Sequence, residues 1–385
     1  MIRKILAFSL MLILAACGIQ PAPRPTSTPF TGTPRPLIID TDMAADDWMA
    51  ILYLLNRPDI SIEAITVTGA GEAHCEPGVR NAMRLTALAG HPDIPVSCGR
   101  ETPLQGNHTF PNAWRENVDA LAGLTIPENS ASPSPQSAVE LLAATLQSSP
   151  DKMTILTLGP LTNLAELLLA TPEAKNNIDM VYIMGGAVEV PGNVGNSRAG
   201  INNQTADWNI YVDPHAAALV FQSGVPMTLV PLDATNHAPV TDSFVKRIKN
   251  DRQTPEARFV FDLLTKYHDF IRSGGYYFWD PLAAAILTEN SLATFETKTL
   301  IVIEEEGNES GRTQVSENGA SIHVAVNADG ERFEQLFLDT LNATEEAIIN
   351  SMIAAEDMTG RNGLLVKALP RDELQEVMRR YGRLE

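Results

Sequence analysis

Short apolar runs rich in β-branched residues alternate along the chain with longer segments of helical periodicity. The apolar runs predict strands at residues 64–67, 154–158, 180–184 and 227–230. The helical periodicity predicts helices at residues 48–55, 79–89, 138–147, 163–170 and 214–222. Strands and helices that alternate in this way form parallel βαβ units.

The predicted strands lack the alternation of apolar and polar residues that a half-exposed sheet shows, so helices should cover both of its faces. We therefore expect an α/β fold with an open, mostly parallel, doubly wound sheet of Rossmann-like form. Residues 298–304 and 321–327 are expected to add strands, and the charged segment from Glu331 onward is expected to form a helix on the outside. Ligands of such sheets bind at the carboxyl ends of the strands.

The N-terminus has the features of a targeting signal, because Arg3 and Lys4 precede an apolar run at residues 5–16. A helix that spans a bilayer needs about 20 apolar residues, so the run predicts a signal peptide and not a membrane span. Its last residues, Leu-Ala-Ala before Cys17, resemble a bacterial lipobox. On this interpretation Cys17 is lipidated, begins the mature chain and anchors it in the cell envelope, outside the cytoplasm. The alternative is a cleaved signal followed by an incidental cysteine.

Residues 18–36 hold six prolines among small and hydroxylated residues, a composition typical of an extended spacer. We accordingly divide the chain into a signal peptide (1–16), a lipidated cysteine with its linker (17–36), a catalytic domain (37–345) and a C-terminal helical extension (346–385). A domain held in this way contacts the membrane through its lipid anchor only.

The chain is acidic: its 385 residues include 47 Asp and Glu against 28 Lys and Arg, a net charge of −19. Because this charge repels phosphate groups, we expect no nucleic acid partner. Cys75 and Cys98 can form a disulfide outside the cytosol or remain as two buried thiols, and the sequence leaves both open. It also leaves open whether the protein is a homo-oligomer.

The candidate chemistry lies after the apolar residues 37–39, where four aspartates precede an amphipathic helix: Asp40, Asp42, Asp46 and Asp47. One or two of them could cap the helix. Carboxylates this close raise one another's pKa unless a cation lies among them, and a hard divalent ion suits a set of oxygen ligands. The alternative is a solvated acidic loop.

The spacing Asp40-x-Asp42-x-x-x-Asp46-Asp47 after an apolar strand resembles the N-terminal signature of the inosine-uridine-preferring nucleoside hydrolases. Later segments resemble motifs of this family in the same order, at residues 158–163, 184–186, 207–214, 231–235 and 280–283. The resemblance spans roughly residues 37–340. It implies that the protein hydrolyses the N-glycosidic bond of a nucleoside to free base and ribose.

The resemblance also implies a Ca²⁺ cofactor, held by Asp42, Asp47, Asp280 and the backbone carbonyl of Leu158. Asp42 would accept a proton from a calcium-bound water that attacks the sugar, and Asp46 would be the second catalytic carboxylate. The side chains that would contact the ribose are those of Asp46, Met184, Asn193, Asp207 and Asn209.

Three positions depart from the family pattern. Glu72 stands where the family commonly has a ribose-binding asparagine, and Asp207 stands where it usually has glutamate. Trp279 replaces a histidine that protonates the leaving base in many members. We expect Glu72 to contact the substrate and Trp279 to stack on the base, although Trp279 could instead only pack the start of a helix. His74 and His108 lie in loops that could face the site, with surface or capping roles as the alternative.

Two other functions stay open. A phosphohydrolase of the haloacid-dehalogenase type also begins with an apolar strand and Asp-x-Asp and uses Mg²⁺. It leaves the pair Asp46-Asp47 and the segment Asp207-x-Asn209 without a role. A lipoprotein that binds nucleosides without catalysis would need no activated water. The sequence does not predict which base or sugar is preferred.

Overall fold

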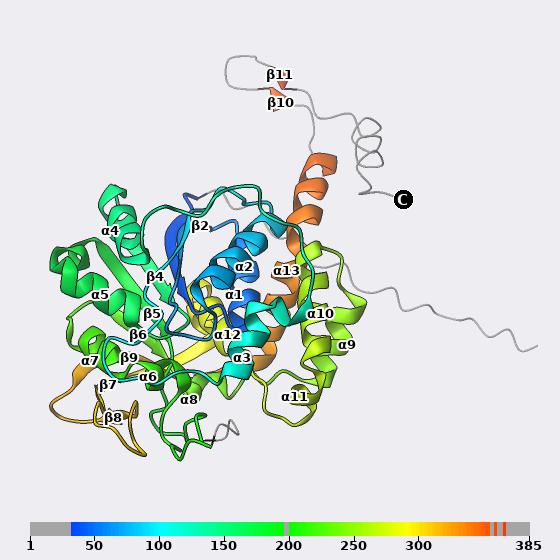
Figure 1. Ribbon diagram of the computed structural model, residues 1–385. Coiled ribbons are helices and arrows are strands. Elements are labelled where there is room, and N and C mark those ends of the chain that lie inside the picture. Colours follow the sequence, from blue (N-terminus) through cyan, green and yellow to red (C-terminus); the bar gives the residue numbers. More distant parts are fainter. Residues whose placement is uncertain (1–31, 196–199, 355–357, 360–364, 367–385) are drawn as a thin grey trace, which may run out of the picture.

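The computed structural model describes residues 32–195, 200–354, 358–359 and 365–366 (Figure 1). The predicted signal peptide, Cys17 and most of the predicted linker lie outside the described residues. Within the described ranges, no helix is both long enough and apolar enough to cross a membrane.

Nine strands of the described chain form one sheet in the order β3-β2-β1-β4-β5-β6-β9-β7-β8. The strands are β1 (Arg35–Thr41), β2 (Ile60–Val67), β3 (Val96–Cys98), β4 (Met153–Thr157), β5 (Ile178–Met184), β6 (Met227–Val230), β7 (Ala293–Val302), β8 (Thr313–Val315) and β9 (Ala320–Ala328). Pairing is parallel from β3 across to β9, and β7 is antiparallel to both β9 and β8. The predicted mostly parallel α/β fold is confirmed.

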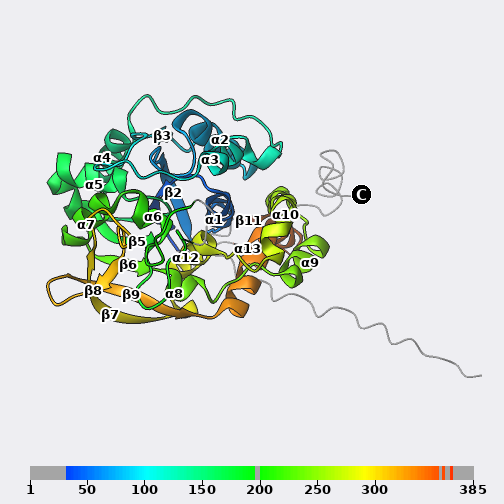
Figure 2. The ribbon, with the colours of Figure 1, turned by 60° about the horizontal axis from the view of Figure 1, so that its bottom comes forward.

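Helices cover both faces of the sheet (Figures 1 and 2). They are α1 (Ala45–Leu55), α2 (Cys75–Leu88), α3 (Asn112–Asp119), α4 (Ala138–Ser148), α5 (Thr162–Ala170), α6 (Trp208–Val212), α7 (Pro214–Gln222), α8 (Leu232–Thr235), α9 (Asp242–Asn250), α10 (Pro255–Lys266), α11 (His268–Arg272), α12 (Trp279–Thr288) and α13 (Gly330–Ala354). Leu37 and Ile39 of β1 pack in the core shared with α1, α2, α10, α12 and α13, whereas Ile38 packs in the core shared with α4, α5 and α7. A strand buried on both sides explains the continuous apolar run in the sequence.

The C-terminal helix differs from its prediction. Phe333, Phe337 and Leu341 of α13 are fully buried, so the first half of this helix belongs to the core and does not lie on the outside. Glu331 and Arg332 of the same half are exposed, and charged residues of this kind made the whole segment look like a surface helix. The domain boundary predicted between residues 345 and 346 falls inside α13, and a two-stranded antiparallel pair follows, β10 (Met358–Thr359) with β11 (Leu365–Val366).

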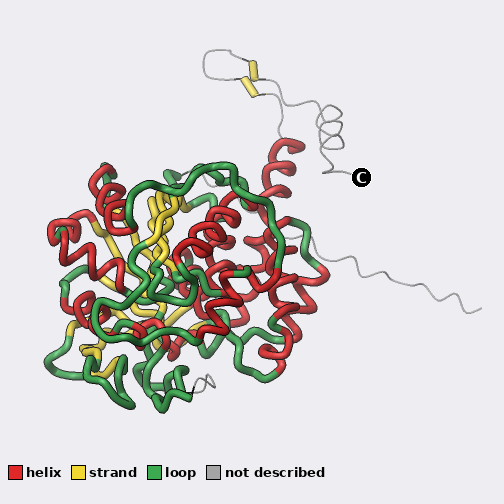
Figure 3. Tube along the Cα trace, in the orientation of Figure 1, coloured by secondary structure: helices red, strands yellow, loops and turns green. Residues whose placement is uncertain are grey.

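The long connections gather at one side of the sheet, where the tube view shows loops crossing the strand ends (Figure 3). One of them is fixed by a disulfide between Cys75, the first residue of α2, and Cys98, the last residue of β3. Of the two possibilities left open by the sequence, the structure therefore has Cys75 and Cys98 as a disulfide and not as two buried thiols.

Candidate active site

The site lies at the point where the order of strands in the sheet reverses, between β1 and β4. From β1 the chain proceeds to β2 and β3 on one side and then returns to place β4 on the other side of β1. The loops after β1 and β4 diverge at such a switch point and leave a crevice between them. Asp42 follows β1 and Leu158 follows β4, so the two come to the same edge of the sheet.

The loop after β1 is tightly folded around Asp42. The amide of Ala44 donates to Asp42 Oδ1 at 3.3 Å, and Met43 has a positive φ of 60°. Glycines bring the next two loops against the same side chain. A Cβ added at Gly71 or Gly159 would lie 2.1 Å or 2.7 Å from the Asp42 Cβ, so neither position admits a side chain.

Asp46 and Asp47 lie in the first turn of α1, and Asp280 lies in the first turn of α12, which packs against α1. Carboxylate oxygens of these three residues lie within 4.8 Å of one another. The hydroxyl of Thr41 donates to Asp47 Oδ1, while Asp47 Oδ2 and Asp280 Oδ1 are buried without a hydrogen-bond partner. Two orphaned carboxylate oxygens in one acidic cluster fit a bound cation, because buried oxygens of this kind are otherwise paired.

The electrostatics agree with this geometry. Burial, followed by the charges of neighbouring aspartates, raises the pKa of Asp42 and of Asp280 well above its usual value. Desolvation is also the largest cause that raises the pKa of Asp46 and of Asp47 to about 7. Without a cation, the cluster therefore holds protons near neutral pH that isolated aspartates would release.

A second group of predicted residues forms a connected network beside the carboxylates. Asn193 Nδ2 donates to Asp207 Oδ2 at 3.1 Å, and the amides of Gly186 and Asn209 donate to Asp207 Oδ1 at 3.1 Å each. Asn209 Nδ2 in turn donates to the carbonyl oxygens of Leu158 at 3.1 Å and of Met184 at 3.2 Å. Burial raises the pKa of Asp207 to about 6. Asp207, Asn193, Asn209, Met184 and Leu158 therefore lie together, as the resemblance implied.

Glu72 reaches the site from the loop after β2. Its amide donates to Asp42 Oδ2 at 3.1 Å. Desolvation and the charges of Asp42 and Asp46 raise the pKa of the Glu72 carboxyl well above its usual value. The charge of Arg115 opposes this rise. Arg115 of α3 is buried and donates to the carbonyl oxygens of Gly69 at 2.9 Å and of Glu72 at 3.3 Å. Sequence reasoning missed Arg115, because a lone arginine on a short amphipathic helix is typical of a surface residue.

Aromatic side chains lie beside the acidic cluster. Trp279, half-buried at the start of α12, meets the Tyr276 ring edge-on with the centroids 5.6 Å apart. Tyr276 stacks on Tyr267 at 5.4 Å, and its buried hydroxyl has no hydrogen-bond partner. Burial is the largest cause that raises the pKa of both tyrosines, and the charges of Asp46 and Glu72 add to the rise in each. Tyr267 was also not predicted from the sequence, since it lies 13 residues before Asp280, between α10 and α11.

The two candidate histidines have partners of their own. His74 Nδ1 pairs with Asp119 at 2.6 Å. His108 Nδ1 lies 2.7 Å from the carbonyl oxygen of Tyr211, and its Nε2 pairs with Glu306 at 3.0 Å. These contacts favour the alternative to a role in the site, which was a surface or capping role for both residues.

Comparison with known proteins agrees with the fold. The family model described as inosine-uridine preferring nucleoside hydrolase matches residues 37–335. The pyrimidine-specific ribonucleoside hydrolase RihA of Photobacterium profundum is 32% identical over 321 residues, which cover 80% of this chain and 98% of that protein.

Solved structures of nucleoside hydrolases are also similar to this chain. The purine-preferring ribonucleoside hydrolase from Gardnerella vaginalis has a TM-score of 0.69 and 27% identity, covering 80% of this chain and 99% of that one. The inosine-uridine preferring nucleoside hydrolase from Bacillus anthracis, at 24% identity and the same coverage, shares the fold with a TM-score of 0.71. The chain belongs to the inosine-uridine-preferring nucleoside hydrolase family and is a nucleoside N-ribohydrolase.

Proposed function

We propose that the hydrolysis depends on Ca²⁺ held by Asp42, Asp47, Asp280 and the carbonyl oxygen of Leu158. The observation that carries this proposal is the pair of buried, unpartnered oxygens, Asp47 Oδ2 and Asp280 Oδ1. All four donors are hard oxygens, the type of ligand that calcium prefers, and they come from three segments of the chain: the junction of β1 and α1, the loop after β4, and the start of α12. The Leu158 carbonyl already accepts from Asn209, but a carbonyl oxygen has a second lone pair.

A bound ion of this kind supplies Lewis acidity, which makes a water nucleophilic at neutral pH. Asp42 would accept the proton of a water activated in this way, and the amides of Ala44 and Glu72 hold its carboxylate in place. Asp46, Asn193, Asp207 and Asn209 hold the ribose hydroxyls, with Met184 packed on the sugar. As the glycosidic bond breaks, positive charge develops on the sugar, and the nearby carboxylates stabilise this charge more than they stabilise the neutral substrate.

Base recognition is assigned to Trp279 and its aromatic neighbours, since an indole stacks on a base but has no titrating proton to give it. Glu72 contacts the substrate where the family commonly uses an asparagine. The relatives include a pyrimidine-specific and a purine-preferring enzyme, so uridine and inosine are both required as test substrates.

The test is product analysis with inosine, uridine and inosine monophosphate, before and after treatment with EDTA. We expect free base and ribose from the nucleosides, loss of activity in EDTA, and recovery with Ca²⁺. Phosphate release from the nucleotide would indicate a phosphohydrolase, and tight binding of unchanged nucleoside would indicate a binding protein. Full activity after complete removal of divalent ions would contradict the calcium proposal.

We also propose that the protein is a lipoprotein of the cell envelope, anchored through Cys17. What supports this is the sequence alone, namely a short apolar run that ends at a cysteine before a proline-rich spacer. Mass spectrometry of the protein from isolated membranes should find diacylated Cys17 at the mature N-terminus, and Cys17→Ser should release an intact, active domain. An unmodified Cys17 would contradict the proposal.

A further inference from the structure

The loop between β2 and α2 carries Glu72 and closes one side of the site. The amide of Glu72 donates to Asp42 Oδ2 at 3.1 Å, and the amide of Ala73 donates to the Asp42 carbonyl oxygen at 2.9 Å. Gly71 lies directly against the Asp42 side chain. Because these contacts are short, a shift of the loop displaces Glu72, whereas Asp42 keeps the contact of its Oδ1 with the amide of Ala44 in its own loop.

The far end of this loop is held by the Cys75–Cys98 disulfide. Cys75 Sγ lies 3.2 Å from the carbonyl oxygen of Gly99 and would lie 2.7 Å from a Cβ at Gly69. The amide of Cys75 donates to Glu101 Oε1 at 3.0 Å. The disulfide therefore ties the loop that carries Glu72 to the chain that leaves β3, the edge strand of the sheet.

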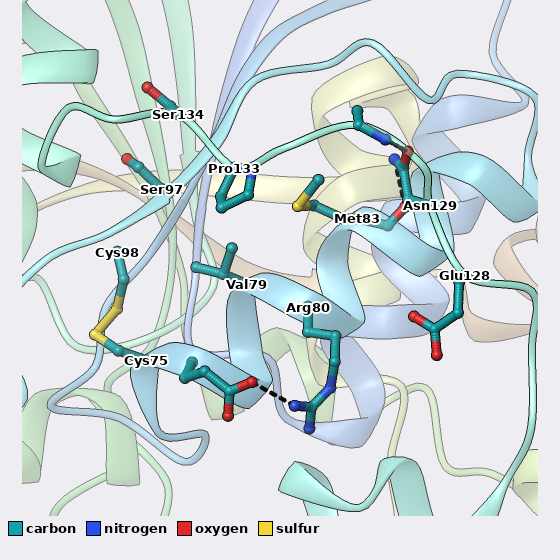
Figure 4. Close-up of a pocket in the computed structure, with 12 residues that line it drawn as sticks. Cys75, Val79, Arg80, Met83, Ser97, Cys98, Glu128, Asn129, Pro133 and Ser134 are labelled. Atoms are coloured by element: carbon teal, nitrogen blue, oxygen red, sulfur yellow. Dashed lines mark hydrogen bonds and ion pairs between the residues drawn. A yellow bond between two sulfur atoms is a disulfide. The ribbon is translucent and has the colours of Figure 1, made fainter.

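The same disulfide forms a wall of a cavity of about 520 Å³, whose lining includes none of Asp42, Asp46, Asp47 and Asp280 (Figure 4). Val79 and Met83 of α2 and Pro133 of the opposite loop line it beside the two cysteines. Both cysteines are half-buried. A cavity of this size admits a small dithiol, so the sulfur atoms can be reached without unfolding.

We propose that the Cys75–Cys98 disulfide is a positioning element for Glu72, and that a thiol reductant acting through this cavity weakens substrate binding. The substrate part rests on the proposed function. In the redox step, a thiolate of the dithiol attacks one cysteine sulfur and the S–S bond breaks. The second thiol of the reagent then displaces that cysteine. Cys75 and Cys98 end as two protonated thiols, and the dithiol ends as a cyclic disulfide, a transfer of two electrons and two protons.

Reduction leaves part of the loop in place, because Arg115 still holds the carbonyl oxygens of Gly69 and Glu72. The metal-binding aspartates do not depend on the disulfide directly. We therefore expect a change in substrate binding larger than the change in turnover. A misplaced contact group of this kind changes KM by about tenfold.

The first measurement is independent of activity. Hydrogen exchange of the full chain, with and without dithiothreitol, should show the amides of Glu72 and Ala73 exchanging at least about tenfold faster after reduction. The amides of β6 serve as the internal control and should not change, since a general loss of structure would accelerate them too. Unchanged exchange at residues 72 and 73 in fully reduced protein would overturn the proposal.

The second measurement is kinetic. Reduced wild type should show an about tenfold rise in KM for uridine or inosine with a smaller fall in kcat, and reoxidation should restore both. The double variant Cys75→Ala/Cys98→Ala should have the kinetics of the reduced protein and should not respond to dithiothreitol. An unchanged KM in reduced wild type would refute the substrate part. If the oxidised protein hydrolyses no nucleoside, the proposed function fails, and the exchange measurement still decides the role of the disulfide.

Discussion

Asp42 is fixed by backbone groups from two segments of the chain. Ala44, in its own loop, donates to one carboxylate oxygen, and Glu72, from the loop after β2, donates to the other. Gly159, after β4, packs against its Cβ. An amide side chain has nearly the same shape as a carboxylate, so substitution by asparagine removes the charge and largely keeps the packing.

The variant Asp42→Asn should lower kcat by at least about 100-fold, because a proton acceptor is lost and a proposed metal ligand is weakened. Asp280→Ala should have an effect of similar size, since it removes a proposed metal ligand that lies on a separate helix. The measurements are kcat for inosine and uridine and Ca²⁺ titration by calorimetry. The exposed Asp151→Asn is the matched control and should keep both values. Wild-type turnover in Asp42→Asn would remove Asp42 from the mechanism.

Trp279→Ala should lower kcat/KM for inosine and uridine by about tenfold, the loss expected when an aromatic stacking partner is removed. The loss should be much smaller for p-nitrophenyl riboside, whose leaving group departs without a proton. Comparison of the two substrate types in wild type and variant measures the difference. An equal loss on both types would show that Trp279 supports the fold or the sugar and not the base.

Three of the carboxylates of the site, Asp42, Asp46 and Asp47, could be predicted because they closely follow an apolar strand in the sequence. Glu72, Asp207 and Asp280 required the family resemblance, since nothing in their neighbourhood alone marks them. Arg115 and Tyr267 could not be predicted, because their roles arise from contacts between segments far apart in the chain. An arginine that binds carbonyl oxygens 40 or more residues away has no local signal.

Among the elements, the predicted strands were confirmed, and the last helix was confirmed as a helix but not in its expected place on the outside. The segments predicted at residues 64–67 and 227–230 lie inside β2 and β6, where burial on both faces demands continuous apolar residues. The predicted start of α1 was wrong by three residues, because the helix begins at Ala45 and not at residue 48. Its first turn holds Asp46 and Asp47, so it lacks the apolar residues from which a helix is predicted. In α13, the charged residues obscured an apolar stripe at Phe333, Phe337 and Leu341.

This stripe gives a prediction for the element. Phe337 is fully buried and packs on Tyr53, Phe244 and Phe278. Phe337→Ala should lower the free energy of unfolding by about 3–5 kcal/mol, through lost burial and the cavity that remains. The exposed Glu331→Ala, on the same helix, should change it by less than about 0.5 kcal/mol. Urea unfolding of both variants measures the difference, and equal stabilities would place α13 outside the cooperative core.

At the scale of the whole molecule, the acidic cluster couples folding to protons and cations. The pKa of Asp46 and of Asp47 rises from 3.8 to about 7 on folding. The folded state therefore binds protons more tightly than the unfolded chain does. This adds to the free energy of unfolding below about pH 4, and the added stability is lost as the pH rises through about 7. A cation that replaces those protons should restore the stability at higher pH.

The melting temperature of metal-free protein should therefore fall as the pH is raised from 5 to 8. Addition of Ca²⁺ should raise it by several degrees at pH 8 and by much less at pH 5, where protons compete for the same oxygens. Scanning calorimetry at both values, with and without EDTA, provides the comparison. In Asp280→Ala the calcium effect should disappear at both values. A calcium effect of equal size at pH 5 and pH 8 in wild type would indicate that these carboxylates do not bind the ion.

The direction of β1 has a mechanical consequence. This strand enters the sheet at Arg35 and reaches the acidic cluster at its other end, after seven residues or about 20 Å. A membrane tether attached before Arg35 would therefore join the domain at the edge of the sheet opposite to the crevice. The opening would point away from the point of attachment, and a nucleoside diffusing in from the surroundings would meet it without passing between the enzyme and its support.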